Sequence, residues 1–379
     1  MTEHHRPHKK ITTELPPDIL FCNILPRLPA ESLHRFRYVS NKWHSIISSP
    51  EFINSHLHHI TKNHRQNHHK LLLLSTTTPC NVHTIDCESP ENGLSPRRPF
   101  PIKVSPENMT IITSCNGLVC VGITKRNYDD NYSDLILWNP LTGDYKKLSK
   151  SHSRKECYYG LYYSDSYDDY RLLCVTLHHR AYIYSLKSDS WRKLDSYTSH
   201  LKRITCLISE SWGECIVHND KVYFLKQGKR RTMGHLSNSI IRFDTKTEKF
   251  RKIVIPCFGV GRRDCLNFTL LHNDRDIYLC VIYKENSVEV SAKLWRMDGD
   301  GDWTEIISYP ILPSLYCFQK PVHLMRNGNW ITYCLHSGCH VYKLDPERRI
   351  NEMSYSNYDD EFDIPPTGKY IETLVSPNW

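Results

Sequence analysis

The chain has 379 residues, 39% of them hydrophobic and 24% charged, which is typical of a globular protein that can bury a sizeable core. The net charge of +8 is modest and its basic residues are spread out, so a solvated basic surface is favoured over a nucleic-acid-binding patch. No apolar run could span a bilayer, and no apolar segment follows the basic start MTEHHRPHKK as in a secretory signal. We expect a soluble cytoplasmic or nuclear protein without a membrane partner, preceded by a disordered tail over residues 1–10.

Residues 11–56 predict three to four short helices. Two prolines and Asp18 suit the first helical turn, where a missing N–H costs little and an acid complements the helix dipole. Pro26 removes a backbone donor and should kink or end this helix near Leu25. The spacing i, i+4, i+8 places three side chains on one face: Leu20, Ile24 and Leu28.

Two further helices are predicted by their N-caps. Ser40 or Asn41 can cap one helix, and Ser49 with Pro50 at the first helical position can begin another. The first of these should turn three apolar side chains inward: Trp43, Ile46 and Ile47. About 45 residues cannot bury all of this apolar surface alone, which indicates an interface.

The segment 57–70 is polar and rich in histidine, and we interpret it as a linker. Its spacing fits no recognised metal template and no Cys or acidic ligand accompanies it, although six histidines occur nearby: His56, His58, His59, His64, His68 and His69. The DGDGD stretch at 298–302 resembles the start of a calcium loop, but Tyr309 stands where that loop needs Glu, so a turn is predicted.

After Lys70 the pattern changes to short strands, and one unit recurs five times. Each copy reads as a strand, a turn rich in Asp, Asn, Thr or Gly, an aromatic residue and, three residues later, an aliphatic one; the fourth copy has an extra residue and the fifth lacks the aromatic. The copies end 46, 59, 53 and 47 residues apart, at Leu148, Leu194, Ile253, Ile306 and Met353.

This repeat predicts a β-propeller. In each turn a short polar side chain can bond the backbone two residues on, and the following aromatic should pack back against the sheet core. A single such sheet cannot bury both faces, so several must stack around an axis. About 300 residues at roughly 50 for each sheet predict about six blades.

The helical segment resembles the F-box. The agreement covers about 45 residues in a dozen or more positions. The matching positions are Leu15, Pro16, Asp18, Ile19, Ile24, Leu25, Arg27, Leu28, Pro29, Ser32, Leu33, Arg35, Arg37, Tyr38, Val39, Trp43, Pro50 and Phe52.

The rest of the chain resembles the plant F-box-associated interaction domain. Its recurrent motifs appear in order as SCNGLVCV, WNPLTGDYKKL, YYGLYYSDSYDDYRLLCV, IIRFDTKTEKFRKIVIP and KLWRMDGDGDWTEI. The resemblance implies an α + β multidomain chain, with a small all-α F-box at 11–56 and an all-β, propeller-like, kelch-like domain at 71–375.

Members of this family are non-catalytic substrate receptors of Skp–cullin–F-box ubiquitin ligases. The resemblance implies docking on a Skp-family adaptor, which connects to a cullin and a RING subunit, while the β-domain captures a protein target whose identity the sequence does not give. By analogy the adaptor-binding side chains are Leu15, Pro16, Ile19, Ile24, Leu28, Leu33, Val39 and Trp43, some of which must instead hold the helices together. Ser40, Asn41 and Pro26 depart from the family pattern, which predicts altered local geometry and retained docking.

No catalytic signature, metal site or cofactor site is predicted from the chain. The 15 cysteines lack a C-x-x-C pair and favour reduced, structural thiols. Tyr/Asp-rich loops could contact a basic target or be plain solvated loops, and the YDDY stretch belongs to the family scaffold. The alternative function is a non-degradative F-box scaffold, or a basic propeller that binds protein or, less favoured, nucleic acid.

Overall fold

The structure is a computed structural model of the chain, and it divides into two compact units, residues 1–66 and 67–379. The residues that it describes are 16, 18–62, 69–75, 80–96, 98–105, 108–125, 132–149, 157–176, 180–194, 215–226, 239–255, 265–273, 275–284, 290–299, 301–311, 320–334, 340–344, 350–353 and 368–378.

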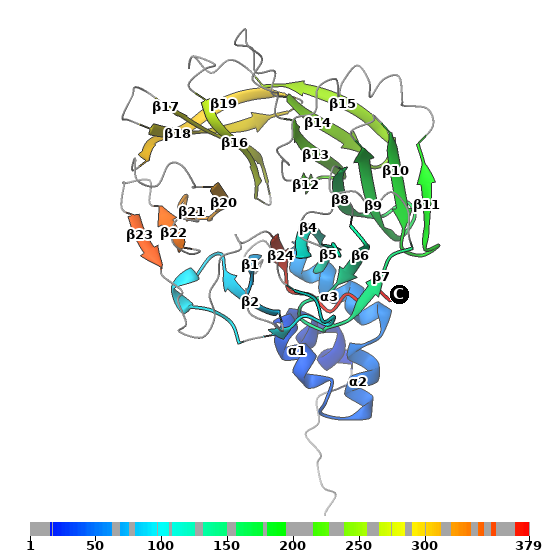
Figure 1. Ribbon diagram of the computed structural model, residues 1–379. Coiled ribbons are helices and arrows are strands. Elements are labelled where there is room, and N and C mark those ends of the chain that lie inside the picture. The colour runs from blue at the N-terminus through cyan, green and yellow to red at the C-terminus, as the bar shows by residue number, and fades with distance from the viewer. Residues whose placement is uncertain are drawn as a thin grey trace, which may run out of the picture. The chain divides into compact units, whose positions relative to one another are not determined.

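The first unit is helical (Figure 1). Its elements are a π-helix η1 (Ile19–Ile24), a 3₁₀-helix η2 (Leu25–Arg27), and the α-helices α1 (Ala30–Phe36), α2 (Asn41–Ile47) and α3 (Pro50–Lys62). Its fully or nearly fully buried apolar side chains are Leu25, Ala30, Leu33, Ile47, Phe52 and Ile53.

Pro26 ends the first helix as predicted, but the predicted apolar stripe is wrong. η1 stops at Ile24, and the N–H of Leu25 donates to the carbonyl of Leu20, five residues back. This wider turn followed by a 3₁₀ turn breaks the 3.6-residue period. Leu20 and Leu28 are therefore half-buried, whereas Ile24 is exposed.

Both predicted N-caps are confirmed. Ser40 Oγ accepts a hydrogen bond from the N–H of Trp43 at 3.2 Å, and α2 begins one residue later. Ser49 Oγ accepts from the N–H of Phe52 at 3.2 Å, with Pro50 as the first residue of α3. In each case the hydroxyl satisfies a donor that the helix leaves unpaired.

The linker is shorter than residues 57–70. α3 continues to Lys62, and strand β1 (His69–Leu74) already includes His69 and Lys70. In the last turn of the helix, Thr61 Oγ1 donates to the carbonyl of Leu57, four residues back, at 2.9 Å, so this polar side chain is satisfied within the helix. Only residues 63–68 lie between the two elements, and they are outside the described residues.

The second unit is a β-propeller whose described strands form six four-stranded antiparallel sheets. Sheet one joins β24 (Gly368–Ile371), β1, β2 (Asn81–Asp86) and β3 (Arg98–Pro99). Sheet two holds β4 (Met109–Cys115), β5 (Leu118–Ile123), β6 (Asp134–Trp138) and β7 (Tyr145–Lys147). Sheet three holds β8 (Cys157–Ser164), β9 (Asp169–Thr176), β10 (Ala181–Ser185) and β11 (Ser190–Lys193).

The later sheets repeat this order. Sheet four holds β12 (Cys215–His218), β13 (Lys221–Lys226), β14 (Ser239–Asp244) and β15 (Lys249–Val254). Sheet five holds β16 (Cys265–His272), β17 (Ile277–Lys284), β18 (Val290–Asp298) and β19 (Asp302–Ile311). Sheet six holds β20 (Lys320–Leu324), β21 (Trp330–Cys334), β22 (His340–Leu344) and β23 (Ile350–Met353); a short 3₁₀ turn, η3 (Pro90–Asn92), precedes β3.

The sheets follow one another around a common centre (Figure 1). The strands nearest to that centre are β4, β8, β12, β16, β20 and β24. The cores lie between neighbouring sheets: Leu72 with Val119 between sheets one and two, and Leu173 with Phe243 between sheets three and four. Each sheet therefore buries its faces only because it has neighbours.

The ring closes through its own C-terminal strand. β24 pairs antiparallel with β1, joining His69 to Ile371 across the length of the unit. Asn139 anchors the segment after β24, because its Nδ2 donates to the carbonyls of Thr373 at 2.9 Å and Val375 at 2.7 Å. Thr373 Oγ1 in turn donates to the carbonyl of Asn116 at 2.7 Å, so sheet two holds the end of the chain on sheet one.

The predicted turn chemistry is confirmed at two copies. Asn139 Oδ1 accepts from the N–H of Leu141 at 2.8 Å, and Asp244 Oδ1 accepts from the N–H of Lys246 at 3.1 Å. The predicted packing of the following aromatic is confirmed for Phe250, which is buried against its cross-strand partner Phe243, but wrong for Tyr145, which is exposed. Both residues lie on the outer strand of their sheet, but Phe250 joins the apolar cluster between sheets three and four, whereas Tyr145 is the first residue of the three-residue strand β7.

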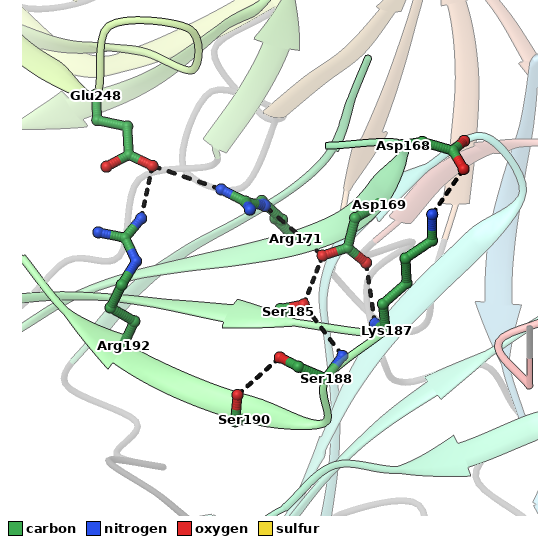
Figure 2. Close-up of polar contacts among 9 residues, drawn as sticks. All are labelled: Asp168, Asp169, Arg171, Ser185, Lys187, Ser188, Ser190, Arg192 and Glu248. Carbon is green, nitrogen blue, oxygen red and sulfur yellow. Dashed lines mark hydrogen bonds and ion pairs between the residues drawn. The ribbon is translucent and has the colours of Figure 1, made fainter. Parts of the chain in front are cut away.

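The YDDY stretch is structural (Figure 2). Buried Asp169 accepts from Ser185 Oγ at 2.6 Å and from the N–H of Lys187 at 3.0 Å, which fixes the turn after β10. Arg171 lies between Asp169 and Glu248, and Glu248 also pairs with Arg192 Nη2 at 2.6 Å. Sheets three and four are thereby tied together by one shared carboxylate.

Most of the cysteines whose side chains the structure describes are buried. Burial raises the pKa of Cys80 to about 11 and that of Cys120 to about 12, which disfavours the thiolate.

Among the described residues, no helix combines the length and apolar character needed to cross a membrane.

Candidate partner-docking site of the helical unit

The structure describes seven of the eight predicted docking residues and divides these into exposed, half-buried and buried side chains. Pro16, Ile19, Ile24 and Val39 are exposed, with exposed fractions of 44% for Ile19, 37% for Ile24 and 64% for Val39. Leu28 and Trp43 are half-buried, and Leu15 lies outside the described residues. Exposed large apolar side chains cost solvation in an isolated unit and are suited to contact with a partner.

The prediction that Leu33 contacts the partner does not fit the structure. Its side chain has no exposed surface, because it lies on the inner face of α1. A partner could reach it only if the unit opened, so its role is to hold the helices together. Leu33 and Phe36 lie three residues apart, a spacing that indicates a core face as readily as a contact face.

Trp43 joins three elements of the unit. Its ring meets Phe21 of η1 edge-on at 5.9 Å and Phe36 of α1 edge-on at 5.6 Å, measured between ring centroids. Such edge-to-face pairs favour a defined arrangement beyond area burial alone. Trp43 therefore positions η1 and α1 against α2, while its half-buried ring keeps some surface for a partner.

Tyr38, which the predicted docking residues do not include, has the largest exposed fraction among the described large apolar side chains, 79%. The chain leaves α1 here in tight turns, with Tyr38 N–H donating to Arg35 and Val39 N–H donating to Phe36. A usable signal was present, because two large side chains in succession directly before the Ser40 cap cannot both turn inward.

A buried histidine fixes the position of η2. His56 on α3 places Nε2 3.0 Å from the carbonyl of Leu28, and its ring stacks on Phe52. Burial lowers the pKa of His56 to about 4, so the ring is neutral at pH 7. This contact holds the segment that carries Ile24 and Leu28 against α3.

No group of three or more His, Cys, Asp or Glu side chains in the described part of the chain is arranged to hold a metal ion. The arrangement in the helical unit instead offers apolar contact area on a small, internally packed support. Such an arrangement is suited to binding a partner.

Two family descriptions match the chain. The F-box domain matches residues 13–55, and the F-box associated beta propeller domain matches residues 64–376. A helical F-box unit followed by a propeller defines the class of protein. The chain belongs to the family of F-box proteins with an F-box associated β-propeller.

Relatives of this chain occur in Arabidopsis thaliana. The putative F-box only protein 15 is 26% identical over 332 residues, covering 82% of this chain and 78% of the relative. An F-box/kelch-repeat protein is 25% identical over 381 residues, covering 94% of each chain. The F-box protein CPR1 is 25% identical over 339 residues, covering 81% of this chain and 76% of its own.

Proposed function

We propose that this chain is the substrate-recognition subunit of a Skp–cullin–F-box ubiquitin ligase. The F-box would dock on a Skp-family adaptor, and the adaptor would connect the chain to a cullin and a RING subunit. The propeller would hold a protein target near a charged ubiquitin-conjugating enzyme. This non-catalytic role raises the effective concentration of the target at the site of transfer.

The observation that carries the proposal is the apolar surface of the F-box unit. Ile19, Ile24 and Val39 remain exposed although the unit buries a core of its own. A few central, well-packed side chains at an interface can each cost about 2 kcal/mol or more of binding free energy when they are truncated. We add Tyr38 to the proposed docking residues and remove Leu33.

Adaptor binding tests the proposal with a closely matched pair of variants. The double variant Ile19→Asp/Val39→Asp should weaken binding of the purified full chain to a Skp-family adaptor at least about thirtyfold, or about 2 kcal/mol. The control is Ile306→Asp/Val254→Asp in the propeller, where the exposed fractions of 47% and 67% match those of Ile19 and Val39. The control should bind like the unchanged chain.

The affinities are measured by isothermal titration calorimetry, and folding of each variant is checked by circular dichroism. Equal adaptor affinity for the two double variants would contradict docking through this surface. Reconstitution with cullin and RING subunits separates the ligase role from a non-degradative scaffold. A chain that binds the adaptor but supports no ubiquitin transfer to itself or to a captured protein would favour the scaffold.

A further inference from the structure

The carbonyl of Leu28 lies between two helices of the F-box unit. η2 ends at Arg27, and Leu28 is already extended, with φ −83° and ψ 153°. The next residue is Pro29, and its carbonyl is the first that α1 uses, accepting from the N–H of Leu33 at 3.1 Å. The Leu28 carbonyl therefore needs a partner from elsewhere in the fold, because a carbonyl withdrawn from water without a partner destabilises the folded state.

His56 supplies that partner from α3, 28 residues further along the chain. Its side chain has no exposed surface, and its Nε2 lies 3.0 Å from the Leu28 carbonyl oxygen. A carbonyl oxygen only accepts, so Nε2 carries the proton and donates. Burial lowers the pKa of His56 to about 4, so at pH 7 the ring is neutral, and its Nδ1 has no hydrogen-bond partner among the described residues.

The imidazole ring is held in place from its own helix. Phe52 lies one turn earlier on α3 and stacks on the imidazole, with 6.3 Å between the ring centroids and 6° between the planes. Phe52 is itself buried, and its N–H donates to Ser49 Oγ at 3.2 Å at the start of the helix. The donor that reaches Leu28 is therefore oriented by a buried neighbour on a capped helix.

The bond holds a segment that carries two proposed docking side chains. Leu25 and Pro26 of η2 are buried, whereas Ile24 directly before them is 37% exposed and Leu28 directly after η2 is half-buried. Pro26 has no N–H and η2 is a single 3₁₀ turn, so local hydrogen bonds alone hold this segment weakly. Rotation of η2 would move Ile24 and Leu28 together, and the bond from His56 opposes that rotation.

We propose that His56 is a positioning residue for adaptor binding, which sets the orientation of Ile24 and Leu28 through its hydrogen bond to the Leu28 carbonyl. This proposal rests on the proposed receptor function. His56 has no exposed surface with which to touch the adaptor, so its effect passes through the main chain of η2. The effect should therefore depend on the N–H donor and not on the volume of the side chain.

A matched pair of variants separates the donor from the volume. His56→Gln and His56→Met have side chains of similar length, but only Gln carries an N–H that can donate to the Leu28 carbonyl. His56→Met should weaken binding of the full chain to a Skp-family adaptor about tenfold, whereas His56→Gln should stay within about threefold of the unchanged chain. Isothermal titration calorimetry measures the affinities at a temperature where circular dichroism shows each variant folded. Equal affinities of His56→Met and the unchanged chain would overturn the proposal.

Double variants show which contacts His56 acts through. In an Ile24→Ala background the effect of His56→Met should shrink to about threefold or less, because a contact that His56 orients has already been removed. In the control background Val39→Ala, whose side chain is also exposed but follows α1, the effect should remain about tenfold. A general loss of stability would weaken binding alike in both backgrounds, so equal effects would overturn the proposal.

The unchanged chain offers a test that does not depend on whether a variant folds. Nuclear magnetic resonance of the histidine ring nitrogens, assigned with His56→Gln, should show the Nε2–H tautomer for His56 at pH 7. The Nδ1–H tautomer would overturn the proposal, since that ring has no proton to donate to Leu28. If the receptor function failed, the unchanged chain would not bind the adaptor and both proposals would fall, whereas failure of this proposal alone leaves adaptor binding intact and insensitive to His56→Met.

Discussion

The two units of this chain differ in how much of their apolar surface they leave exposed for their size. Among the described residues, the large apolar side chains that stay exposed divide equally between them. They are Ile19, Ile24, Tyr38 and Val39 in the short helical unit, and Tyr145, Tyr167, Val254 and Ile306 in the far longer propeller. The propeller conceals its apolar faces because each sheet has a neighbour on both sides, whereas the helical unit has too few layers to do so.

The contrast extends to the surfaces that the two units present. The helical unit has exposed apolar side chains, whereas the propeller has polar turns and a central cavity lined by both polar and apolar residues. Its integrity also depends on closure by β24, whereas helices of the first unit are formed by local caps such as Ser40 and Ser49.

The largest expected effect concerns closure of the ring. Gly117 has φ +88°, and an added Cβ would collide with Thr373 Oγ1 and approach the carbonyl of Ile371 at 3.0 Å. Gly117→Ala should lower the free energy of unfolding by about 4 kcal/mol, because backbone strain and the lost C-terminal anchor add together. Gly143→Ala is the control, since Gly143 has φ +79° and open space around it, and should cost only about 1 kcal/mol.

Urea unfolding, followed by far-ultraviolet circular dichroism, measures both values. A similar loss in the two variants would show that closure through the C-terminal segment contributes little, and the contrast between a ring-closed unit and a locally formed one would not hold.

The second largest expected effect is the difference in stability between truncating a buried and an exposed side chain of the helical unit. Leu33→Ala removes a fully buried side chain and should cost about 3 kcal/mol. Val39→Ala alters an exposed one and should change stability by no more than about 0.5 kcal/mol. Hydrogen exchange of the amides in α1 and α3 measures the stability of this unit separately from the propeller. A comparable loss of protection in both variants would place Val39 in the core.

The smallest effect is a dependence on pH through buried His323. Burial lowers its pKa to about 3, so the unfolded chain binds a proton below about pH 6.5 that the folded chain does not accept. Stability is therefore complete above pH 6.5 and falls as the pH decreases toward 3. At pH 5 the loss from this residue should be about 2 kcal/mol.

His323→Gln should lack this part of the acid dependence when urea unfolding is compared at pH 7 and pH 5. His56→Gln should remove a similar contribution from the helical unit, where burial lowers the pKa of His56 to about 4. An unchanged acid dependence in His323→Gln would mean that the proton is accepted without cost in the folded propeller.

Hydrogen bonds between a side chain and the nearby backbone were predicted from the sequence at particular residues. Ser40 and Ser49 cap helices because their hydroxyls bond the backbone three residues on, and Asn139 and Asp244 form turns because their side chains bond two residues on. Such contacts depend on near neighbours in the chain. The predicted packing of the aromatic after the turn holds for Phe250 but not for Tyr145, since it depends on whether the side chain reaches the apolar cluster of a neighbouring sheet.

The sequence predicted which types of residue form the candidate docking site, but it predicted only some of their positions correctly. The resemblance named Ile19, Ile24 and Val39, which the structure exposes, but also Leu33, which it buries. A short apolar stripe does not distinguish a contact face from a core face. The π-helix at η1 added a further difference, because it shifted the face on which Ile24 lies.

The sequence by itself determined the helical cassette, its caps, the repeated turns and the division into a helical unit and a propeller, since each follows from bonds between residues close in the chain. Tertiary structure alone decided the pairing of β24 with β1, the Arg171–Glu248 tie between sheets and the central cavity that gathers His69, His272 and Lys369. These contacts join residues that are far apart in the chain, and no local pattern encodes which distant strand will lie beside which.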